Sequence, residues 1–232
     1  MSQNDPAEFD AYNQNYNAAV NSAISFSGLS VDFFTRVKAE YIISVLTAQF
    51  HDVSQLDLLD VGCGIGNSHS FFTKKIRSLT GVDVSSECIK TAVENNPWVD
   101  YRVYDGYRLP FDDSQFDAAF TICVMHHVAP AQWASFAREL RRVVRPGGIT
   151  LVFEHNPYNL LTQRVVSNCV FDKDAVLLTA RQTQRLLNEA GFRNVEVRYI
   201  LTIPSSNRIL QKVDSLFGRL PLGAQYYAMG VS

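Results

Sequence analysis

Leu58-Leu59-Asp60-Val61-Gly62-Cys63-Gly64-Ile65-Gly66 is a short apolar run that ends in three closely spaced glycines. The apolar part predicts a buried strand. The glycines predict a tight turn, at which the backbone can approach a ligand closely because no Cβ stands in the way. Turns of this kind occur in nucleotide-binding folds of several types. The spacing of the glycines and the residues beside them must therefore decide which type of ligand the turn binds.

Two details argue against a dinucleotide site. In the dinucleotide fingerprint the third glycine follows the second by three residues and lies over the helix that holds a pyrophosphate. Here Gly64 and Gly66 are separated by a single residue. Asp60 stands directly before the turn, where its charge would repel a pyrophosphate but would suit a ligand with a cationic end. The alternative is that Asp60 only accepts hydrogen bonds within the turn.

Strand and helix patterns alternate along the rest of the chain. This alternation predicts an α/β fold with a mostly parallel sheet covered on both faces, in which ligands bind beyond the carboxyl ends of the strands. The expected strands are 56–61, 79–84, 99–104, 116–124, 149–155, 195–203 and 225–231. The expected helices are 31–50, capped by Ser30, then 67–79, one that starts after Ser85 or Ser86, 131–145 and 179–190.

An acidic residue closes the second expected strand, and another follows the third. Asp83 lies 23 residues after Asp60, close to the spacing of about 20 residues at which a carboxylate can accept hydrogen bonds from both hydroxyls of a ribose. Asp105-Gly106 follows the third strand. Asp83 could instead cap the next helix, and Asp105 could be an ordinary turn residue.

These motifs, together with Arg145-Pro146-Gly147-Gly148 before the fifth strand, resemble the class I S-adenosylmethionine-dependent methyltransferases over about residues 56–155. The resemblance implies a Rossmann-like sheet of seven strands, mostly parallel with the last strand antiparallel. It also implies S-adenosyl-L-methionine as cofactor, with the ribose on Asp83 and the adenine near Asp105. The expected cofactor contacts are Tyr16, Asp60, Gly62, Cys63, Gly64, Gly66, Asp83, Val84, Asp105, Gly106, Ile122, Cys123 and His127.

Three histidines are candidates for catalysis. His126 and His127 end the fourth expected strand, and His155 ends the fifth, where acceptors enter in this fold. A histidine titrates near neutral pH and can deprotonate a hydroxyl. Adjacent residues on a strand point in opposite directions, so we do not expect His126 and His127 both to face the site. Each of the three could instead be a structural side chain.

The chain has two expected parts. Residues 1–50 form an N-terminal helical cap over the cofactor site, in which Tyr12 and Tyr16 either cover the cofactor or pack on the core. Residues 51–232 form the cofactor-binding domain. Within it, residues 156–178 are long for a connection between a strand and a helix, and we expect them to recognise the substrate.

Composition excludes several function classes. Twenty-one lysines and arginines against 23 acidic residues give a net charge of −2, which provides no electrostatic reason to expect nucleic acid. No apolar run is long enough to span a membrane, and no secretory leader is apparent, so a cytoplasmic protein is the default. We expect no metal site, since the four cysteines are scattered and the histidines lack ligand spacing apart from the adjacent pair.

The sequence therefore predicts a methyltransferase that acts on a small-molecule acceptor, with oxygen slightly favoured over nitrogen because histidines flank the site. Two alternatives stay open. The chain could be a non-catalytic subunit that binds the cofactor and activates a partner, or a nicotinamide-dependent oxidoreductase. The identity of the acceptor and the oligomeric state do not follow from the sequence.

Overall fold

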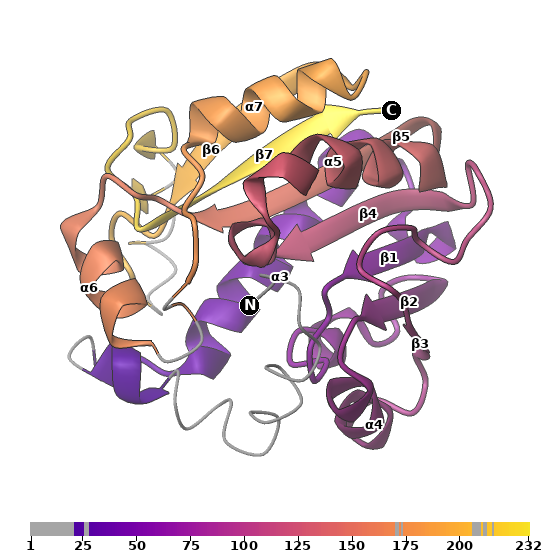
Figure 1. Ribbon diagram of the computed structural model, residues 1–232, viewed down its shortest axis with the longest axis horizontal. Helices are drawn as coiled ribbons and strands as arrows, with labels where there is room; N and C mark the ends of the chain where they lie inside the picture. Colours follow the sequence, from indigo (N-terminus) through magenta and orange to yellow (C-terminus); the bar gives the residue numbers. More distant parts are fainter. Residues whose placement is uncertain are drawn as a thin grey trace.

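Seven strands form one continuous sheet in the computed structural model of the protein (Figure 1), which describes residues 21–25, 28–169, 172, 174–205, 210, 213–214 and 216–232. The order is β3-β2-β1-β4-β5-β7-β6, and β7 is antiparallel to both of its neighbours. The expected Rossmann-like sheet with an antiparallel last strand is confirmed. The strands are β1 (Asp57–Val61), β2 (Ser78–Asp83), β3 (Asp100–Val103), β4 (Phe116–Ile122), β5 (Val144–His155), β6 (Arg193–Ile200) and β7 (Gln225–Val231).

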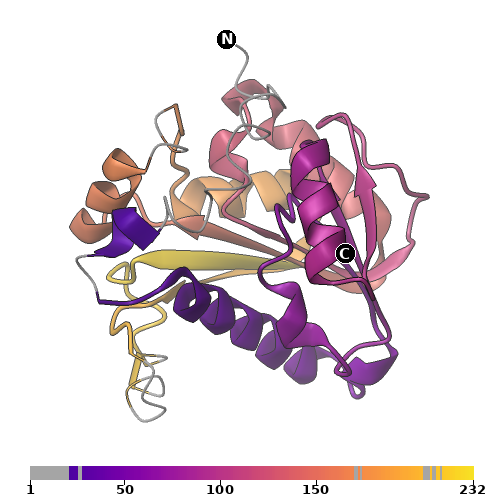
Figure 2. The ribbon, with the colours of Figure 1, turned by 90° about the horizontal axis from the view of Figure 1, so that it is seen from below.

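Helices cover both faces of this sheet. In Figure 2, α3 lies on one side, and α5 and α7 lie on the other. The α-helices within the described ranges are α3 (Val31–Gln49), α4 (Ser86–Asn95), α5 (Trp133–Val143), α6 (Leu160–Asn168) and α7 (Ala180–Glu189). Short 3-10 turns are η2 (Val53–Gln55), η3 (His69–Phe72), η4 (Met125–His127) and η5 (Pro130–Gln132).

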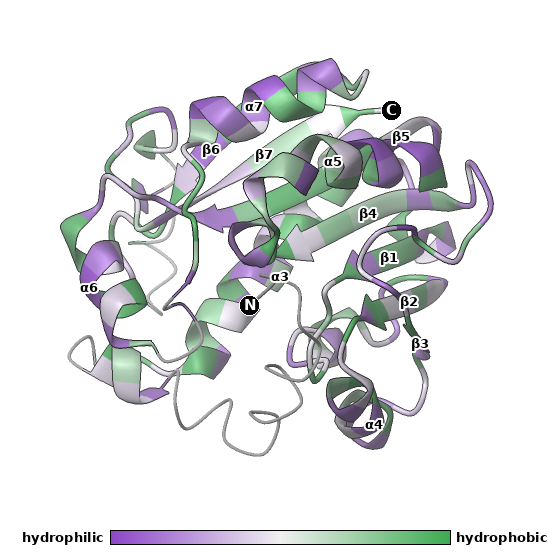
Figure 3. Cartoon of the chain, viewed as in Figure 1, coloured by the Kyte–Doolittle hydropathy of each residue, from purple (hydrophilic) through white to green (hydrophobic). Residues whose placement is uncertain are grey.

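The core consists of two apolar layers, one on each face of the sheet. Neighbouring strand residues point to opposite faces, so Leu58 packs with α3 while Leu59 packs with α5. The central strands are apolar along most of their length, whereas the helices show polar residues on their outer sides (Figure 3). Such continuous apolar strands are typical of a sheet buried on both faces.

Helix starts follow the capping residues of the sequence. The side chain of Ser30 accepts a hydrogen bond from Phe33 N, and Ser85 accepts one from Cys88 N. Thr179 and Gln182 form a reciprocal capping box at the start of α7. Each cap satisfies a backbone N–H that has no partner within the helix.

The expected helix at 67–79 is wrong. Only η3 forms there, followed by turns that include Lys74 at φ 61°. The segment is rich in serine, threonine and histidine, which are weak helix formers. In addition, the side chain of His69 is turned inward to contact Asp60, an interaction that fixes the chain in a tight turn.

Several strand limits also differ from expectation by one to five residues, and the backbone explains two of these differences. β4 ends at Ile122 rather than at residue 124, because Cys123 adopts φ 57°, which no regular strand allows. β5 begins at Val144 rather than at Ile149, and Gly147 within it adopts φ 82° beside a register shift against β4. The Pro-Gly-Gly segment is therefore an irregular part of the strand rather than a turn before it.

The connection at 156–178 contains α6, which lies beyond the carboxyl end of β5 (Figure 1). Asn159 caps this helix, and the Thr162 hydroxyl donates to Ala224 O at 2.7 Å. Among the described residues, no helix combines the length and apolar character required to cross a bilayer.

Candidate functional site

A cavity of about 340 Å³ opens at the carboxyl ends of β1, β2, β4 and β5. Its walls come from the glycine turn after β1, from η4 and from α3 and α6. The sequence-predicted residues that line it are Asp60, Gly62, Cys63, Gly64, Asp83, Val84, Gly106, Ile122, Cys123, His126, His127 and His155. Segments far apart in the sequence therefore meet in one place, as parallel strands require.

The glycine turn places its backbone against the cavity. Gly62, Gly64 and Gly66 all adopt positive φ, between 52° and 76°. A Cβ on Gly62 would overlap Val124, whereas a Cβ on Gly64 would have nothing within 4 Å. Gly64 therefore faces open space, into which a ligand can come close to the backbone.

Asp83 joins the turn to the start of α4. Its Oδ2 accepts from Gly64 N at 2.8 Å, and its Oδ1 accepts from Ser85 N at 2.9 Å. Burial raises the pKa of this carboxyl, and the two backbone donors oppose the rise. Because a carboxylate oxygen can accept more than one hydrogen bond, each oxygen retains capacity for a ligand hydroxyl.

Asp60 is buried beneath the turn and paired with a histidine. Its Oδ2 lies 2.9 Å from His69 Nε2, and His69 Nδ1 lies 2.5 Å from the hydroxyl of Tyr101. Burial raises the pKa of Asp60, an effect that His69 partly offsets. Asp60 Oδ1 is buried with no hydrogen-bond partner among the described residues. Sequence reasoning missed His69 because the local pattern predicts a regular helix in that segment.

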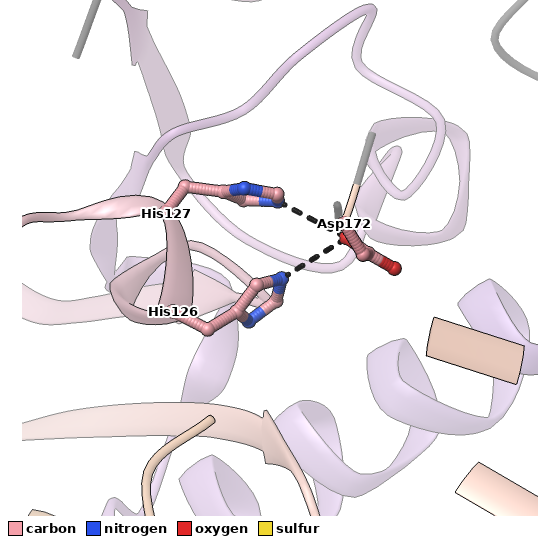
Figure 4. Close-up of side chains that lie close together, drawn as sticks. All are labelled: His126, His127 and Asp172. Atoms are coloured by element: carbon pink, nitrogen blue, oxygen red, sulfur yellow. Dashed lines mark ion pairs between the residues drawn. The ribbon is translucent and has the colours of Figure 1, made fainter. Parts of the chain in front are cut away.

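His126 and His127 both line the cavity, and both approach Asp172 (Figure 4). The expectation that only one of them faces the site is wrong. They lie on the 3-10 turn η4, which rotates successive residues by about 120° rather than the about 180° of a strand. Their ring centroids are 4.1 Å apart.

Two buried carboxylates flank His126. Glu154 and His126 have side chains that are each 1% exposed, and His126 Nδ1 lies 2.6 Å from Glu154 Oε2. Glu154 Oε1 accepts from Met125 N at 2.8 Å. Burial alone would lower the pKa of His126, but Glu154 and Asp172 outweigh it and raise this pKa well above the ordinary value.

The pKa values of the other two histidines are lowered rather than raised. Burial and the charge of His126 lower the pKa of His127 to about 3 and that of His155 to about 4. Both rings are therefore neutral near pH 7. His155 Nδ1 lies 3.3 Å from Gln225 Nε2, and Gln225 Oε1 accepts from the buried Lys38 Nζ at 3.2 Å. This orientation makes Nδ1 of His155 an acceptor and leaves the proton on Nε2.

Two predicted cofactor contacts lie elsewhere in the described part of the chain. The Asp105 side chain accepts from Tyr107 N and Arg108 N, both at 2.8 Å, and lies in an exposed turn outside the cavity lining. Gly66 packs under Tyr101 rather than along the cavity. Tyr12 and Tyr16 lie outside the described residues.

Sequence reasoning also missed four residues that surround the histidines, namely Lys38, Glu154, Asp172 and Gln225. Asp172 belongs to the long connection, and its N–H donates to Cys169 O at 3.2 Å. Val176 N donates to His126 O at 2.9 Å, which fastens the same connection over η4. A weak signal for Asp172 is present in the sequence, since the connection carries charged residues within an otherwise apolar stretch.

Residues 59–152 match the model of a methyltransferase domain family. This part of the chain is therefore similar to a methyltransferase domain. The match runs from within β1 to within β5, and it includes the glycine turn, Asp83 and η4.

Two curated relatives have named activities. The chain is 38% identical over 103 residues to a 2-methyl-6-phytyl-1,4-hydroquinone methyltransferase of Synechocystis, a match that covers 43% of this chain and 32% of that protein. It is 31% identical over 120 residues to a ubiquinone biosynthesis O-methyltransferase of Rickettsia bellii, covering 50% of this chain and 49% of that protein. In these matches the chain spans about a third to a half of the length of the relatives.

A solved structure shares the fold over nearly the whole chain. It is a possible histamine N-methyltransferase from Thermotoga maritima, with a TM-score of 0.71 and 20% sequence identity. The alignment covers 97% of this chain and 98% of that one. At this identity the likeness concerns the fold alone.

The cavity fits the cofactor of the family. Gly64 leaves open space for a ligand against the backbone, and Asp83 retains acceptor capacity toward hydroxyls. Asp60 Oδ1 has no hydrogen-bond partner within the described ranges, and it suits an ammonium group because a buried carboxylate oxygen without a donor is costly.

Proposed function

We propose that this protein transfers a methyl group from S-adenosylmethionine to an oxygen atom of a small-molecule acceptor. The observation that carries the proposal is the meeting of Asp60, Gly64 and Asp83 with three histidines in one cavity. Bound S-adenosylmethionine supplies an electrophilic methyl group on a sulfonium. The protein then has to hold an acceptor in line with that methyl and to exclude water.

The chain divides these tasks between two sides of the cavity. On the cofactor side, the backbone at Gly62 to Gly66 and the carboxylate of Asp83 would hold the amino acid and ribose parts, and Asp60 would accept from the ammonium. On the acceptor side, His127 and His155 would contact a hydroxyl group. His155, whose Nδ1 is engaged by Gln225, would orient the acceptor oxygen through Nε2.

An oxygen acceptor is supported by two lines of argument. The cavity carries histidines that can bind or deprotonate a hydroxyl. The Rickettsia relative is named an O-methyltransferase, and the name of the Synechocystis relative gives a hydroquinone substrate but not the atom that is methylated. The structural neighbour is described as a possible N-methyltransferase. A direct test must therefore distinguish transfer to oxygen from transfer to nitrogen.

The test combines binding and turnover. Calorimetry with S-adenosylhomocysteine should show one site per chain, and a panel of phenols and hydroquinones, each matched by the corresponding arylamine, should give methylated product with the hydroxyl compounds. Product found only with the amines would refute oxygen transfer. No binding of the nucleoside would refute the whole proposal.

The role of His155 is tested in the same assay. His155→Ala should reduce turnover about 10²-fold or more, because the acceptor oxygen is no longer held in line, while the affinity for S-adenosylhomocysteine is retained. His51→Ala is the matched control, because His51 is exposed and does not line the cavity. A turnover of His155→Ala within twofold of the unmodified protein would remove this histidine from the mechanism.

A further inference from the structure

His126, His127 and Asp172 present three ligand atoms to one point at the edge of the cavity (Figure 4). The Nε2 atoms of both histidines lie 3.5 Å from the same carboxylate oxygen, Asp172 Oδ1. All three atoms lie within 4.8 Å of one another. We propose that these residues bind a divalent transition metal ion of the Zn²⁺ type.

The separations suit a metal better than direct hydrogen bonds. A nitrogen–oxygen hydrogen bond normally spans about 2.7–3.2 Å, so 3.5 Å is long for either histidine. Ligands about 2.0–2.1 Å from a tetrahedral Zn²⁺ lie about 3.3–3.4 Å from one another. The two observed edges are therefore close to those of a tetrahedron with the metal at its centre.

The surroundings of His126 match those of a metal ligand. A ligating histidine usually directs its other ring nitrogen to a carboxylate, which fixes the tautomer and orients the ring. His126 Nδ1 makes this contact with Glu154 at 2.6 Å, and Glu154 is itself held by Met125 N. The lone pair of His126 Nε2 then points toward Asp172, as the site requires.

The negative charges around the three ligand residues also favour a bound cation. Asp172 and Glu154 place two carboxylates, with side chains 9% and 1% exposed, on opposite sides of His126. A divalent ion held by His126, His127 and Asp172 would place positive charge close to both carboxylates.

The donor set indicates the class of metal. Two imidazoles and one carboxylate suit Zn²⁺, Fe²⁺ or Mn²⁺, whereas Mg²⁺ prefers oxygen ligands and several waters. Three protein ligands leave a fourth position open, as in catalytic zinc sites. Resting on the proposed function, we assign that position to the acceptor hydroxyl, whose pKa the metal would lower so that the oxygen becomes a better nucleophile.

Metal binding can be measured without turnover. Protein free of any polyhistidine tag is stripped with a chelator and titrated with Co²⁺ and with Zn²⁺. We expect one ion per chain, the intense visible bands of tetrahedral Co²⁺, and displacement of Co²⁺ by Zn²⁺. Asp172→Asn, an isosteric change that removes the charged ligand, should abolish the bands, and His51→Gln should leave them unchanged.

Glu154→Gln provides a second variant that keeps all three ligands. It should weaken Zn²⁺ affinity about 10–100-fold, because the partner that orients His126 loses its charge. Circular dichroism confirms that each variant is folded. The proposal is overturned if no ion binds, or if Co²⁺ binding is the same in Asp172→Asn as in the unmodified chain.

Calorimetry with S-adenosylhomocysteine on the same samples separates the two proposals. Nucleoside binding without metal binding would refute the metal site and leave methyl transfer in place. Metal binding without nucleoside binding would refute methyl transfer and leave the metal site in place.

Discussion

Asp83→Asn tests the cofactor side of the site with the smallest change in shape. The carboxylate accepts from Gly64 N and from Ser85 N, so an amide nitrogen in place of either oxygen would face an N–H group. The variant therefore weakens the hydrogen bonds by which residue 83 joins the glycine turn to α4. It also removes the charged acceptors for a ribose. Each charge-assisted bond is worth about 1.5–3 kcal/mol.

We expect the loss of about one such bond, about 1.5–3 kcal/mol, in binding of S-adenosylhomocysteine, because Asn keeps one side-chain oxygen as an acceptor, and the dissociation constant then rises about 10- to 150-fold. Isothermal titration calorimetry measures this directly. Asp112→Asn is the control, because it makes the same chemical change at an exposed position outside the cavity. A dissociation constant of folded Asp83→Asn within twofold of the unmodified protein would refute the assignment of the ribose to Asp83.

Two further predictions concern stability. The guanidinium of Arg142 holds the pKa of Glu139 below its ordinary value of 4.5, so the ion pair stabilises the folded protein at neutral pH. This stabilisation decreases as the pH falls below 4.5, and it is lost once the pH has fallen below the lowered pKa of Glu139. The melting temperatures of Glu139→Gln and the unmodified protein should therefore converge on acidification, and a constant difference would contradict this. Gly62→Ala should cost at least about 1–3 kcal/mol in chemical denaturation, since positive φ and overlap with Val124 both oppose it. Gly191→Ala, also at positive φ but with nothing near its Cβ, should cost less, and equal losses would show that packing against Val124 is unimportant.

Local patterns in the sequence are sufficient to predict most of the sheet. The pattern at 225–231 predicts β7 with both ends correct, and α3 begins directly after its expected cap, Ser30. The position of such an element depends on its apolar periodicity and on a capping side chain. Both signals lie within the segment itself, so the sequence predicts them. The motif Asp60 to Gly66 also predicts the position of the turn, because positive φ at a glycine is a local requirement.

The errors arise where a distant contact outweighs local preference. The segment after the glycine turn is not a helix, because His69 turns inward to Asp60 and Tyr101. Neither partner is identifiable from the segment itself. The role of Asp105 at the adenine is a different case and stays a prediction, because its carboxylate accepts hydrogen bonds from two backbone amides of its own turn. An acid followed by glycine is compatible with either role.

The histidine cluster shows most clearly why the acceptor side is harder to predict than the cofactor side. Cofactor contacts follow consecutive strand ends, so their positions depend on the regular sheet. Asp172 reaches His126 and His127 only because the connection after α6 folds back over η4, where Val176 N donates to His126 O. The three ligand atoms thus meet through one turn and one long connection, neither of which has a periodic pattern. Resting on the proposed function, we expect substitutions in that connection to change the choice of acceptor while the glycine turn and Asp83 stay the same.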